Sequence, residues 1–316
     1  MTDSEKDNKT ELTSVKIKNG LTLIITSVIS IFISTLLAPH ILKYVNDGLR
    51  LCFNVIIGSV FPFLILTDII LCTSHFENIK WLRLPFEKLF KINGYAISAF
   101  LIGIICGFPI GVKVSADLYK NGYISKNECE RLIGFSNNTG PAFIISGIGF
   151  GMRGSIRDGI ILYISMVVSA IISGLISGRN KKPSNKKPSR FNANYNFSAS
   201  VKSAALNTLY ICAFIILFSI VCGLVKSIVA NELIFSLIIP FIEVSNSAKI
   251  LSKATLFSRN IGLILTSFAI SFSGISVHMQ AKSFLLETDI SMRCYYVTKF
   301  LQGCISAVIT SIIILI

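Results

Sequence analysis

Residues 159–178 read GIILYISMVVSAIISGLISG and contain no charged side chain. A helix needs about 20 consecutive, mostly apolar residues to cross the hydrocarbon core of a bilayer, so this stretch is long enough to span a membrane. Further long apolar stretches lie at 21–42, 51–74, 93–112, 132–152, 203–225, 260–281 and 300–316; among these only 51–74 contains a charged residue, Asp68. The pattern predicts an all-α, polytopic integral membrane protein.

The composition agrees with this class. Of 316 residues, 52% are hydrophobic and 15% are charged, and the mean hydropathy is +0.70. Soluble domains carry about 25% charged residues. The net charge of +14 comes from 30 Lys and Arg against 16 Asp and Glu. These basic residues lie between the apolar stretches, as in cytoplasmic loops, rather than on a hydrated face that would bind nucleic acid.

The distribution of basic residues also bears on topology. If all eight stretches crossed with the N-terminus inside, the most basic loop, residues 179–202, would lie outside, against the positive-inside rule. If residues 93–112 and 260–281 enter and leave by one face, that loop becomes cytoplasmic. We therefore expect re-entrant or broken segments at these two places, with Lys120 inside and Arg153 outside. The first stretch lacks a cleavage site and is expected to be a retained helix.

The sequence divides at the basic linker RNKKPSNKKPSR, residues 179–190. We interpret the linker as a solvated, flexible segment that sets topology; a contact with anionic lipid is the alternative. The expected parts are an N-terminal tail and first helix, a first repeat, a linking helix with the basic loop, and a second repeat. Their bounds are residues 1–50, 51–152, 153–202 and 203–316.

A weak internal repeat relates the two halves. Residues 54–61 resemble 207–214, Pro85-Phe86 resembles Pro240-Phe241, and residues 112–116 resemble 277–281. With the two re-entrant segments, the halves would be antiparallel. Inverted repeats of this kind occur in many secondary transporters, whose sites lie at the membrane midplane where broken helices meet.

The first predicted break is Gly107-Phe-Pro-Ile-Gly111. Pro109 lacks an amide hydrogen and the two glycines weaken a helix, so the backbone groups freed here need protein or water partners. Lys113 and Asp117 follow, one helical turn apart. Either they form a pair in which Lys113 reaches toward the interface, or they contact a substrate or ion.

The second predicted break is Asn137-Asn-Thr-Gly-Pro141, within an uncharged stretch. The side chains of Asn137, Asn138 and Thr139 would be costly to bury without partners. Gly140 interrupts the helix, and Pro141 suits the first turn of a new one. We expect a helix N-terminus here, which attracts anions and polar acceptors. A polar loop outside the membrane is the alternative.

The third break is expected within SFSGISVHMQ, residues 271–280, at the place in the second repeat that the first break takes in the first. Gly274 would interrupt the helix. The polar candidates for substrate binding are Ser273, Ser276, His278 and Gln280. His278 can titrate near physiological pH, although a hydrogen-bonded structural role is the alternative.

Isolated carboxylates add candidates for ion or proton coupling. Asp68 lies among apolar residues, where a carboxylate must pair, take up a proton or face water. Glu243 is similar but nearer an interface. We assign coupling to Asp68, Asp117 or His278, and substrate binding to the polar and breaking residues of the three breaks.

No enzyme motif is present, and we expect no enzyme activity and no cofactor. The three histidines are scattered, and the eight cysteines have no C-x-x-C spacing and lie mostly in apolar runs, so neither a metal site nor a disulfide is expected. The expected partners are the lipid bilayer, a small polar solute and a second copy of the chain. No nucleic acid is expected.

The three breaks, GFPIGVK (107–113), NNTGP (137–141) and SFSGISVHMQ (271–280), resemble the signature stretches of the YlbJ-type sporulation integral membrane proteins. The similarity runs from about residue 50 to the C-terminus, with Val112 where that family often has a small residue. The family is assigned to the nucleoside-recognition, or Gate, group, with the concentrative nucleoside transporters, the gate regions of bacterial ferrous-iron transporters and spore maturation membrane proteins.

This resemblance implies inverted Gate-type repeats and a role in endospore formation in the plasma or forespore membrane of a Gram-positive bacterium. It adds other sporulation membrane proteins to the expected partners but supplies no substrate. We expect a transporter or permease for a nucleoside-like or other small polar solute; the alternative is a non-transporting scaffold or ligand sensor for assembly of the spore envelope.

Overall fold

The computed structural model describes residues 38–73, 80–179, 181–184, 196–253 and 257–316, together with Ile24 and Val28. The chain divides into two compact units, residues 1–46 and 47–316, and the second unit contains every element from η1 onward. Most of the predicted span at residues 21–42, and most of the basic linker, lie outside the described residues.

Every described element is a helix, so the all-α expectation is confirmed. The elements are α2 (Ala38–Leu51), η1 (Cys52–Ile56), α3 (Ile57–Thr73), α4 (Lys80–Phe90), η3 (Gly94–Ala96), α5 (Ile97–Ile105), α6 (Ile110–Lys120), α7 (Lys126–Ser136), η4 (Ala142–Met152), α8 (Ile156–Gly178), α9 (Phe197–Ile228), α10 (Glu232–Ile242), α11 (Val244–Lys253), α12 (Arg259–Phe272), α13 (Gly274–Ser283) and α14 (Arg293–Leu315). Of these, η1 and η4 are π-helices and η3 is a 3₁₀ helix.

Within the described residues, four helices are long and apolar enough to cross a membrane, or up to six spans result if each of two bent helix pairs forms one. The four are α8, α9, α14 and the segment Arg259–Ser283, which contains α12 and α13. The predicted stretches 159–178, 203–225 and 300–316 are thus confirmed as parts of helices of spanning length. The predicted stretch 132–152 instead contains the end of α7, the break at 137–141 and η4.

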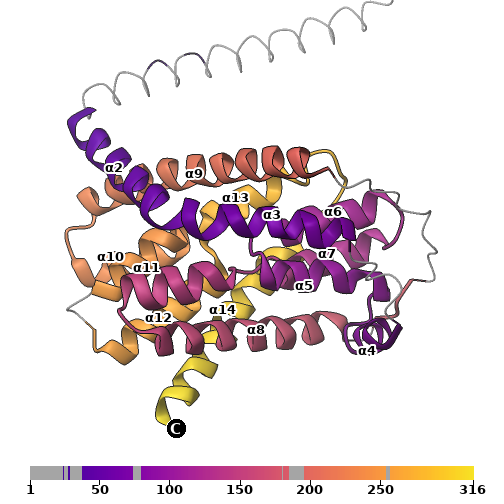
Figure 1. Ribbon diagram of the computed structural model, residues 1–316. Helices are drawn as coiled ribbons and strands as arrows, with labels where there is room; N and C mark the ends of the chain where they lie inside the picture. The colour runs from indigo at the N-terminus through magenta and orange to yellow at the C-terminus, as the bar shows by residue number, and fades with distance from the viewer. Residues whose placement is uncertain are drawn as a thin grey trace, which may run out of the picture. The chain divides into compact units, whose positions relative to one another are not determined.

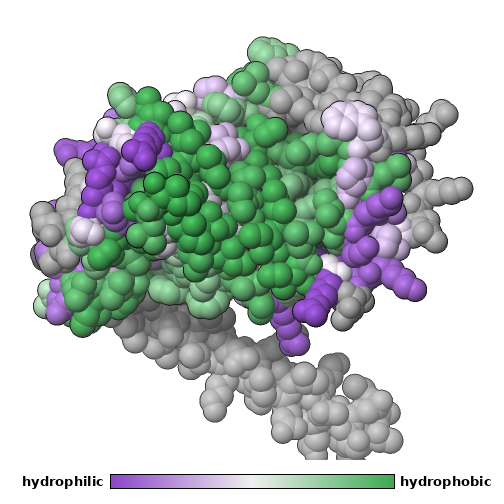
Figure 2. Space-filling model, turned by 90° about the horizontal axis from the view of Figure 1, so that it is seen from below, coloured by the Kyte–Doolittle hydropathy of each residue, from purple (hydrophilic) through white to green (hydrophobic). Residues whose placement is uncertain are grey.

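The outer surface of the second unit is suited to lipid. On α8, Ile156, Ile160 and Ile164 recur one turn apart and are exposed, whereas Ser165 and Ser169 on the opposite face are buried. This arrangement is the reverse of a soluble helix and is typical of membrane helices, whose small and polar residues pack against protein. Figure 2 shows a face on which hydrophobic residues form a broad band with hydrophilic residues grouped at its two ends.

The segment 93–112 doubles back on itself, as expected. Helices α5 and α6 pack against each other, and a Cβ added at Gly103 would lie 3.3 Å from the Cα of Gly111. These residues are eight positions apart along the chain, so the chain must reverse between them, at residues 106–109. The two helices lie beside α7 in Figure 1.

Both helices of the hairpin pack closely on α7 at one backbone carbonyl. The oxygen of Ser136, the last residue of α7, points at the Cα atoms of both Gly103 and Gly111: a Cβ there would lie 1.7 Å and 2.1 Å from it. Glycine is therefore required at both positions by close approach of the backbones. The hydroxyls of Ser115 and Ser136 lie 3.2 Å apart beside this contact.

The second re-entrant or broken segment was predicted at residues 260–281, and the helix there is broken, at Ser273 between α12 and α13, without folding back. Arg259–Ser283 has the length and hydropathy of a single span, interrupted at Ser273 but running on. The chain doubles back earlier, between α10 and α11, which are joined by Glu243 alone and pack against each other. Neither arm of this hairpin has the length of a span, and Glu243 and Asn246 supply the polar turn that lets the chain reverse there.

Candidate functional site

The tip of the α5–α6 hairpin is shaped by Gly107. Its φ of +83° lies in the left-handed region that glycine tolerates, and Pro109 then precedes α6 directly. A Cβ at Gly107 would lie 2.6 Å from the amide nitrogen of Gly140. The first two predicted breaks, at 107–111 and 137–141, are therefore brought into contact.

The break at 137–141 is buried, not a loop outside the unit. Asn137, Asn138 and Thr139 are completely buried between α7 and η4. The amide of Asn138 donates to the carbonyl of Phe135 (2.7 Å), and the hydroxyl of Thr139 donates to the carbonyl of Ile270 in α12 (2.8 Å). As predicted, a new helix, η4, begins directly after Pro141.

A buried cation that the sequence reading missed supports this break. Lys299 of α14 is 0% exposed, and its Nζ donates to the carbonyl of Asn137 and to Oε1 of Gln302, both at 2.8 Å. Nε2 of Gln302 donates in turn to Oδ1 of Asn138 (2.8 Å). No carboxylate pairs with Lys299 within the described chain. The carbonyl end of a helix carries partial negative charge, which the ammonium complements.

His278 belongs to the same buried network. The amide of Asn137 donates to the hydroxyl of Tyr295 (2.9 Å), which lies 3.1 Å from Nδ1 of His278. Nε2 of His278 is buried and has no hydrogen-bond partner among the described residues. The network therefore joins the second predicted break to the third.

The third break combines two residues in the left-handed region. Ser273 has a φ of +77° and Gly274 one of +68°. A Cβ at Gly274 would lie 3.0 Å from the carbonyl oxygen of Ile242 and 3.1 Å from the amide of Glu243, so the tip of the α10–α11 hairpin packs on this break. The packing mirrors that of the α5–α6 tip on the break at 137–141.

Glu243 is fully buried at that tip. Its two carboxylate oxygens accept the backbone amides of Ser245 (2.9 Å) and Asn246 (2.6 Å), and the Asn246 side chain adds a third donor (2.9 Å). Glu243 thereby occupies the N-terminus of α11, where a negative charge is favoured.

The two broken helices, α7–η4 and α12–α13, run in opposite directions, as the ion pairs between their ends show. At one end Asp158 accepts from Arg153, after η4, and from Arg259, at the start of α12 (3.0 and 3.1 Å). At the other, Lys120 and Lys126, before and within α7, pair with Glu287 and Asp289, after α13 (both 3.0 Å). The end of one broken helix thus meets the start of the other.

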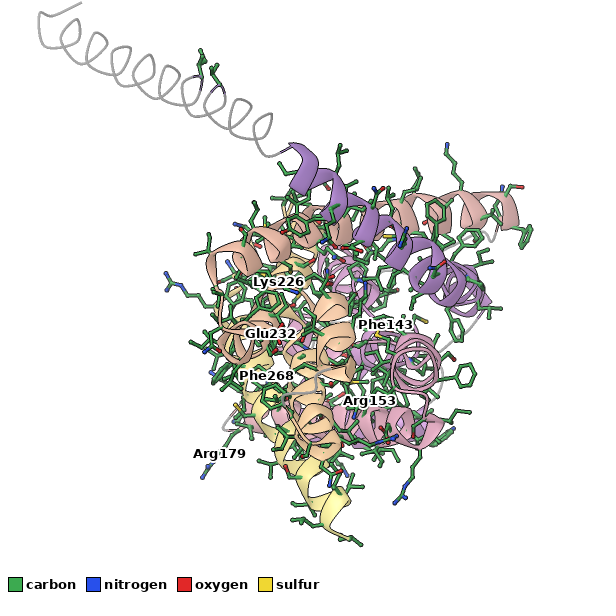
Figure 3. All side chains as sticks on the ribbon, turned by 90° about the vertical axis from the view of Figure 1, so that its left-hand side faces the viewer. Phe143, Arg153, Arg179, Lys226, Glu232 and Phe268 are labelled. Atoms are coloured by element: carbon green, nitrogen blue, oxygen red, sulfur yellow. The ribbon has the colours of Figure 1, made fainter. Side chains whose placement is uncertain are left out.

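A narrow cavity of about 30 Å³ lies where the tips and breaks meet. Both hairpins reach it, through Gly107 and Glu243, and so do the two broken helices, through Thr139 and Gln280. Apolar residues of η1, α3 and α9 complete the wall, with Phe143 of η4, which Figure 3 labels among the helices. The oxygen Oε1 of Gln280 is buried and has no hydrogen-bond partner among the described residues.

The predicted site residues therefore separate into groups. Of them, Gly107, Thr139, Gly140 and Gln280 line the cavity. Others support it from behind: Pro109, Gly111, Asn137, Asn138, Pro141, Ser273, Gly274, Ser276 and His278. Lys113 and Asp117 lie on α6, do not form the ion pair that was one of the two alternatives for them, and do not line the cavity. Asp68 lies in α3, and its side chain is outside the described residues.

One end of the basic linker is docked away from the cavity. The buried carboxylate of Glu128 accepts the backbone amides of Asn93 (2.7 Å), Ser125 (2.7 Å) and Ser184 (2.9 Å), together with the Ser184 hydroxyl. Burial alone would raise the pKa of Glu128, but the bonds from Ser184 and Ser125 outweigh it and lower that pKa. The start of the linker is thus anchored at Ser184, while its Lys181 and Lys182 are exposed.

Comparison with known proteins also indicates an integral membrane protein. The chain is 24% identical over 305 residues to the sporulation integral membrane protein YlbJ of Bacillus subtilis (strain 168), covering 83% of this chain and 75% of that protein. No family model matches the chain, and no solved structure does. The chain is thus a homologue of the sporulation integral membrane protein YlbJ of Bacillus subtilis.

Proposed function

We propose that the protein is a transporter or permease for a small polar solute that acts in spore formation, in the plasma or forespore membrane of a Gram-positive bacterium. The observation that carries the proposal is the cavity at which two hairpin tips and two broken helices meet. Secondary transporters build their sites in this way, because freed backbone groups at membrane depth are tolerated only beside a cavity or protein.

The order of elements supports two inverted Gate-type repeats. A hairpin, a broken helix and a long helix occur as α5–α6, α7–η4 and α8, and again as α10–α11, α12–α13 and α14. The antiparallel broken helices agree with inversion. This order extends the first repeat into α8 and pairs the break at 273–274 with the break at 137–141, rather than with the first break.

The position of the second hairpin, at α10–α11, also bears on how the basic residues divide between the two sides of the membrane. If α12–α13 crosses the membrane, Lys282 and Arg293 lie on the same side as Lys120, Lys126 and the basic linker. That side is then the cytoplasmic one by the positive-inside rule. The cluster of Asp158, Arg153 and Arg259 faces outward.

Alternating access follows from this geometry. The cavity is narrow, and ion pairs close the ends of both broken helices, on the outer side at Asp158 and on the inner side at Glu287 and Asp289. Opening of one cluster while the other stays closed would expose the cavity to one side at a time.

A scaffold or a ligand sensor is the competing class. Buried ionisable groups favour transport over a scaffold. Lys299 and Glu243 are unfavourable at membrane depth and neither forms an ion pair among the described residues, and ionisable groups in such places usually mark a substrate or ion pathway. A sensor would bind a solute at the same cavity without moving it.

A thiol at the cavity offers a test that needs no known solute. Cys106 lines the cavity, and a Cys106→Ser variant removes its signal from the other thiols. A transporter predicts labelling of Cys106 by a membrane-impermeant thiol reagent from both sides, in right-side-out and in inverted vesicles. Labelling from neither side, or from one side only, would reject alternating access. Complementation of a sporulation-defective deletion strain by Gln280→Leu, with Gln302→Leu beside it, would show whether cavity and network are needed.

A further inference from the structure

We propose that the exposed side of α4 and the adjoining start of the basic linker form a binding surface for anionic phospholipid headgroups of the cytoplasmic leaflet. The sequence left a lipid contact of the linker as an alternative; the structure adds α4 to this contact and gives it a place. The inference takes from the proposed function only the side of the membrane on which the linker lies, and it does not depend on transport.

Helix α4 lies across the direction of the helices beside it. The segments Trp81–Phe90 and Gly94–Ile105 are bent by 103° relative to each other. In Figure 1, α4 is seen end-on beside the end of α8, which lies across the view. Because α8 has the length of a membrane span, a helix at its end that crosses its direction lies along the membrane surface, as interfacial helices do.

The side of α4 that faces away from the protein is largely apolar. Phe86 and Phe90 are buried in the core. On the opposite side, Trp81, Leu84 and Leu89 are 75%, 58% and 55% exposed. Tryptophan is enriched at the boundary between headgroups and hydrocarbon, so this side of the helix suits that boundary.

Two contacts hold the start of the linker beside the end of α4. A Cβ at Gly178, the last residue of α8, would lie 2.5 Å from the carbonyl oxygen of Phe90. Six residues further along the chain, the side chain of Asn93 donates to the carbonyl of Ser184 (3.0 Å). Residues 179–183 connect these two contacts and therefore stay close to the C-terminal end of α4.

Exposed basic side chains without a counter-charge lie together on this surface. They are Lys88 and Lys91 at the end of α4, and Arg179, Lys181 and Lys182 at the start of the linker. None of them forms an ion pair with another residue that the structure describes. The carboxylates of the same region, Glu87 and Glu128, already accept backbone amides. Clustered basic residues beside a membrane attract acidic headgroups, and the apolar border with Trp81 favours a lipid over a soluble polyanion.

Trp81 is the single tryptophan of the chain, so its fluorescence reports on this surface alone. The full chain would be reconstituted into vesicles of equal parts phosphatidylcholine and phosphatidylglycerol, with bromine, which quenches tryptophan, on the acyl chains of one lipid or of the other. We expect stronger quenching when phosphatidylglycerol carries the bromine, corresponding to an about tenfold preference for the anionic lipid beside Trp81, since each nearby basic residue contributes up to roughly a factor of five. High salt should bring the preference toward one.

Variants assign the preference to the basic residues. Lys88→Gln combined with Lys182→Gln removes one charge from each segment and should reduce the preference to about twofold or less, whereas the same two residues changed to Arg should keep it. The matched control is Arg157→Gln combined with Lys226→Gln, at exposed residues near the ends of α8 and α9 that are farthest from the linker. This control should keep the wild-type preference.

Equal quenching by the two brominated lipids, a preference that survives high salt, or the same loss in the control as in the test variant would overturn the proposal. Quenching by neither lipid would place α4 in water and overturn it as well. If there is no lipid preference but a short single-stranded oligonucleotide changes Trp81 fluorescence in phosphatidylcholine vesicles, the surface binds nucleic acid instead. A lipid preference with labelling of Cys106 from one side only would reject transport but leave the surface; two-sided labelling without a lipid preference would reject the surface alone.

Discussion

The contact of the Ser136 carbonyl with the α5–α6 hairpin leads to a quantitative prediction for Gly103→Ala. The added Cβ would lie 1.7 Å from this oxygen, whereas Cβ atoms essentially never approach others within 3.0 Å, so the backbones must separate by at least 1.3 Å. Neither side of the contact is a flexible side chain. Overpacking of this kind costs about 1–3 kcal/mol and sometimes more.

We expect a loss near the upper end of that range, about 3 kcal/mol, because two arms of one hairpin rest on the same carbonyl. For a chain of this size, 1 kcal/mol corresponds to roughly 2–4 °C in Tm, so the expected decrease is about 6–12 °C. The measurement is thermal unfolding in detergent with a dye that fluoresces on reacting with thiols. The buried Cys52, Cys129, Cys212 and Cys222 react only when the fold opens.

Gly58→Ala is the matched control. A Cβ at Gly58, in α3, meets nothing within 4 Å, and alanine is favoured over glycine in a helix by about 0.5–1 kcal/mol. Its Tm should stay level or rise by a few degrees. A Gly103→Ala protein that unfolds within about a degree of the wild type would refute the close contact, and equal losses in both variants would refute its specificity.

Further predictions concern the network, the linker and the topology. Lys299→Met should abolish complementation of a sporulation defect with little change in Tm. Two acceptors lose their partner at a cost of about 1–3 kcal/mol each, while the cost of burying a cation is removed. Lys282→Met, at an exposed lysine, should complement, and full complementation by Lys299→Met would contradict the role of the network. The pKa of Glu128 in the folded protein lies below its ordinary value of 4.5, so the ionised carboxylate stabilises the fold above that pH, and this contribution is lost as the pH falls through the lowered pKa. The Tm of Glu128→Gln should therefore decline less steeply than that of the wild type below pH 4.5. An unchanged slope would count against the anchor. Cysteines placed at Lys120 and Glu287 should be labelled from the cytoplasmic side and those at Arg157 and Arg259 from the other side, whereas labelling of 287 together with 259 would restore a re-entrant segment at 260–281.

The breaks were predictable because their causes are local. Gly107 and Pro109 cannot continue a helix, and Gly140-Pro141 ends one helix and opens another; both effects act within a few residues of the chain. The membrane-spanning character of α8 and α9 was equally accessible, since it depends only on length and composition.

The position of the second hairpin was not predictable in this way. Loop charges indicate how many crossings separate two loops, but a fold-back at 260–281 and one at 232–253 both place the basic linker inside. The sequence marks Glu243 as an isolated carboxylate near an interface. Its place in the turn depends on donors from Ser245 and Asn246, which exist only once α11 begins there.

Lys299 escapes prediction from the sequence because a charged residue marks the boundary of an apolar span, here the stretch 300–316. The sequence did hold a signal: Lys299 and Gln302 are three positions apart and share one face of an otherwise apolar helix. Their partners, Asn137 and Asn138, lie more than 160 positions earlier, and no local rule connects the two segments.

The π-helical form of η4 has a consequence for motion. Its hydrogen bonds close wider rings than those of an α-helix, so more residues are wound into each turn and the rod is shorter for the same number of residues. One end follows the buried break and the other is tied by Arg153 to Asp158. A change of η4 from a π-helix to an α-helix would lengthen the segment and rotate Phe143 about the helix axis. The distance that η4 spans between the cavity and the outer surface can therefore change without any change in the number of residues.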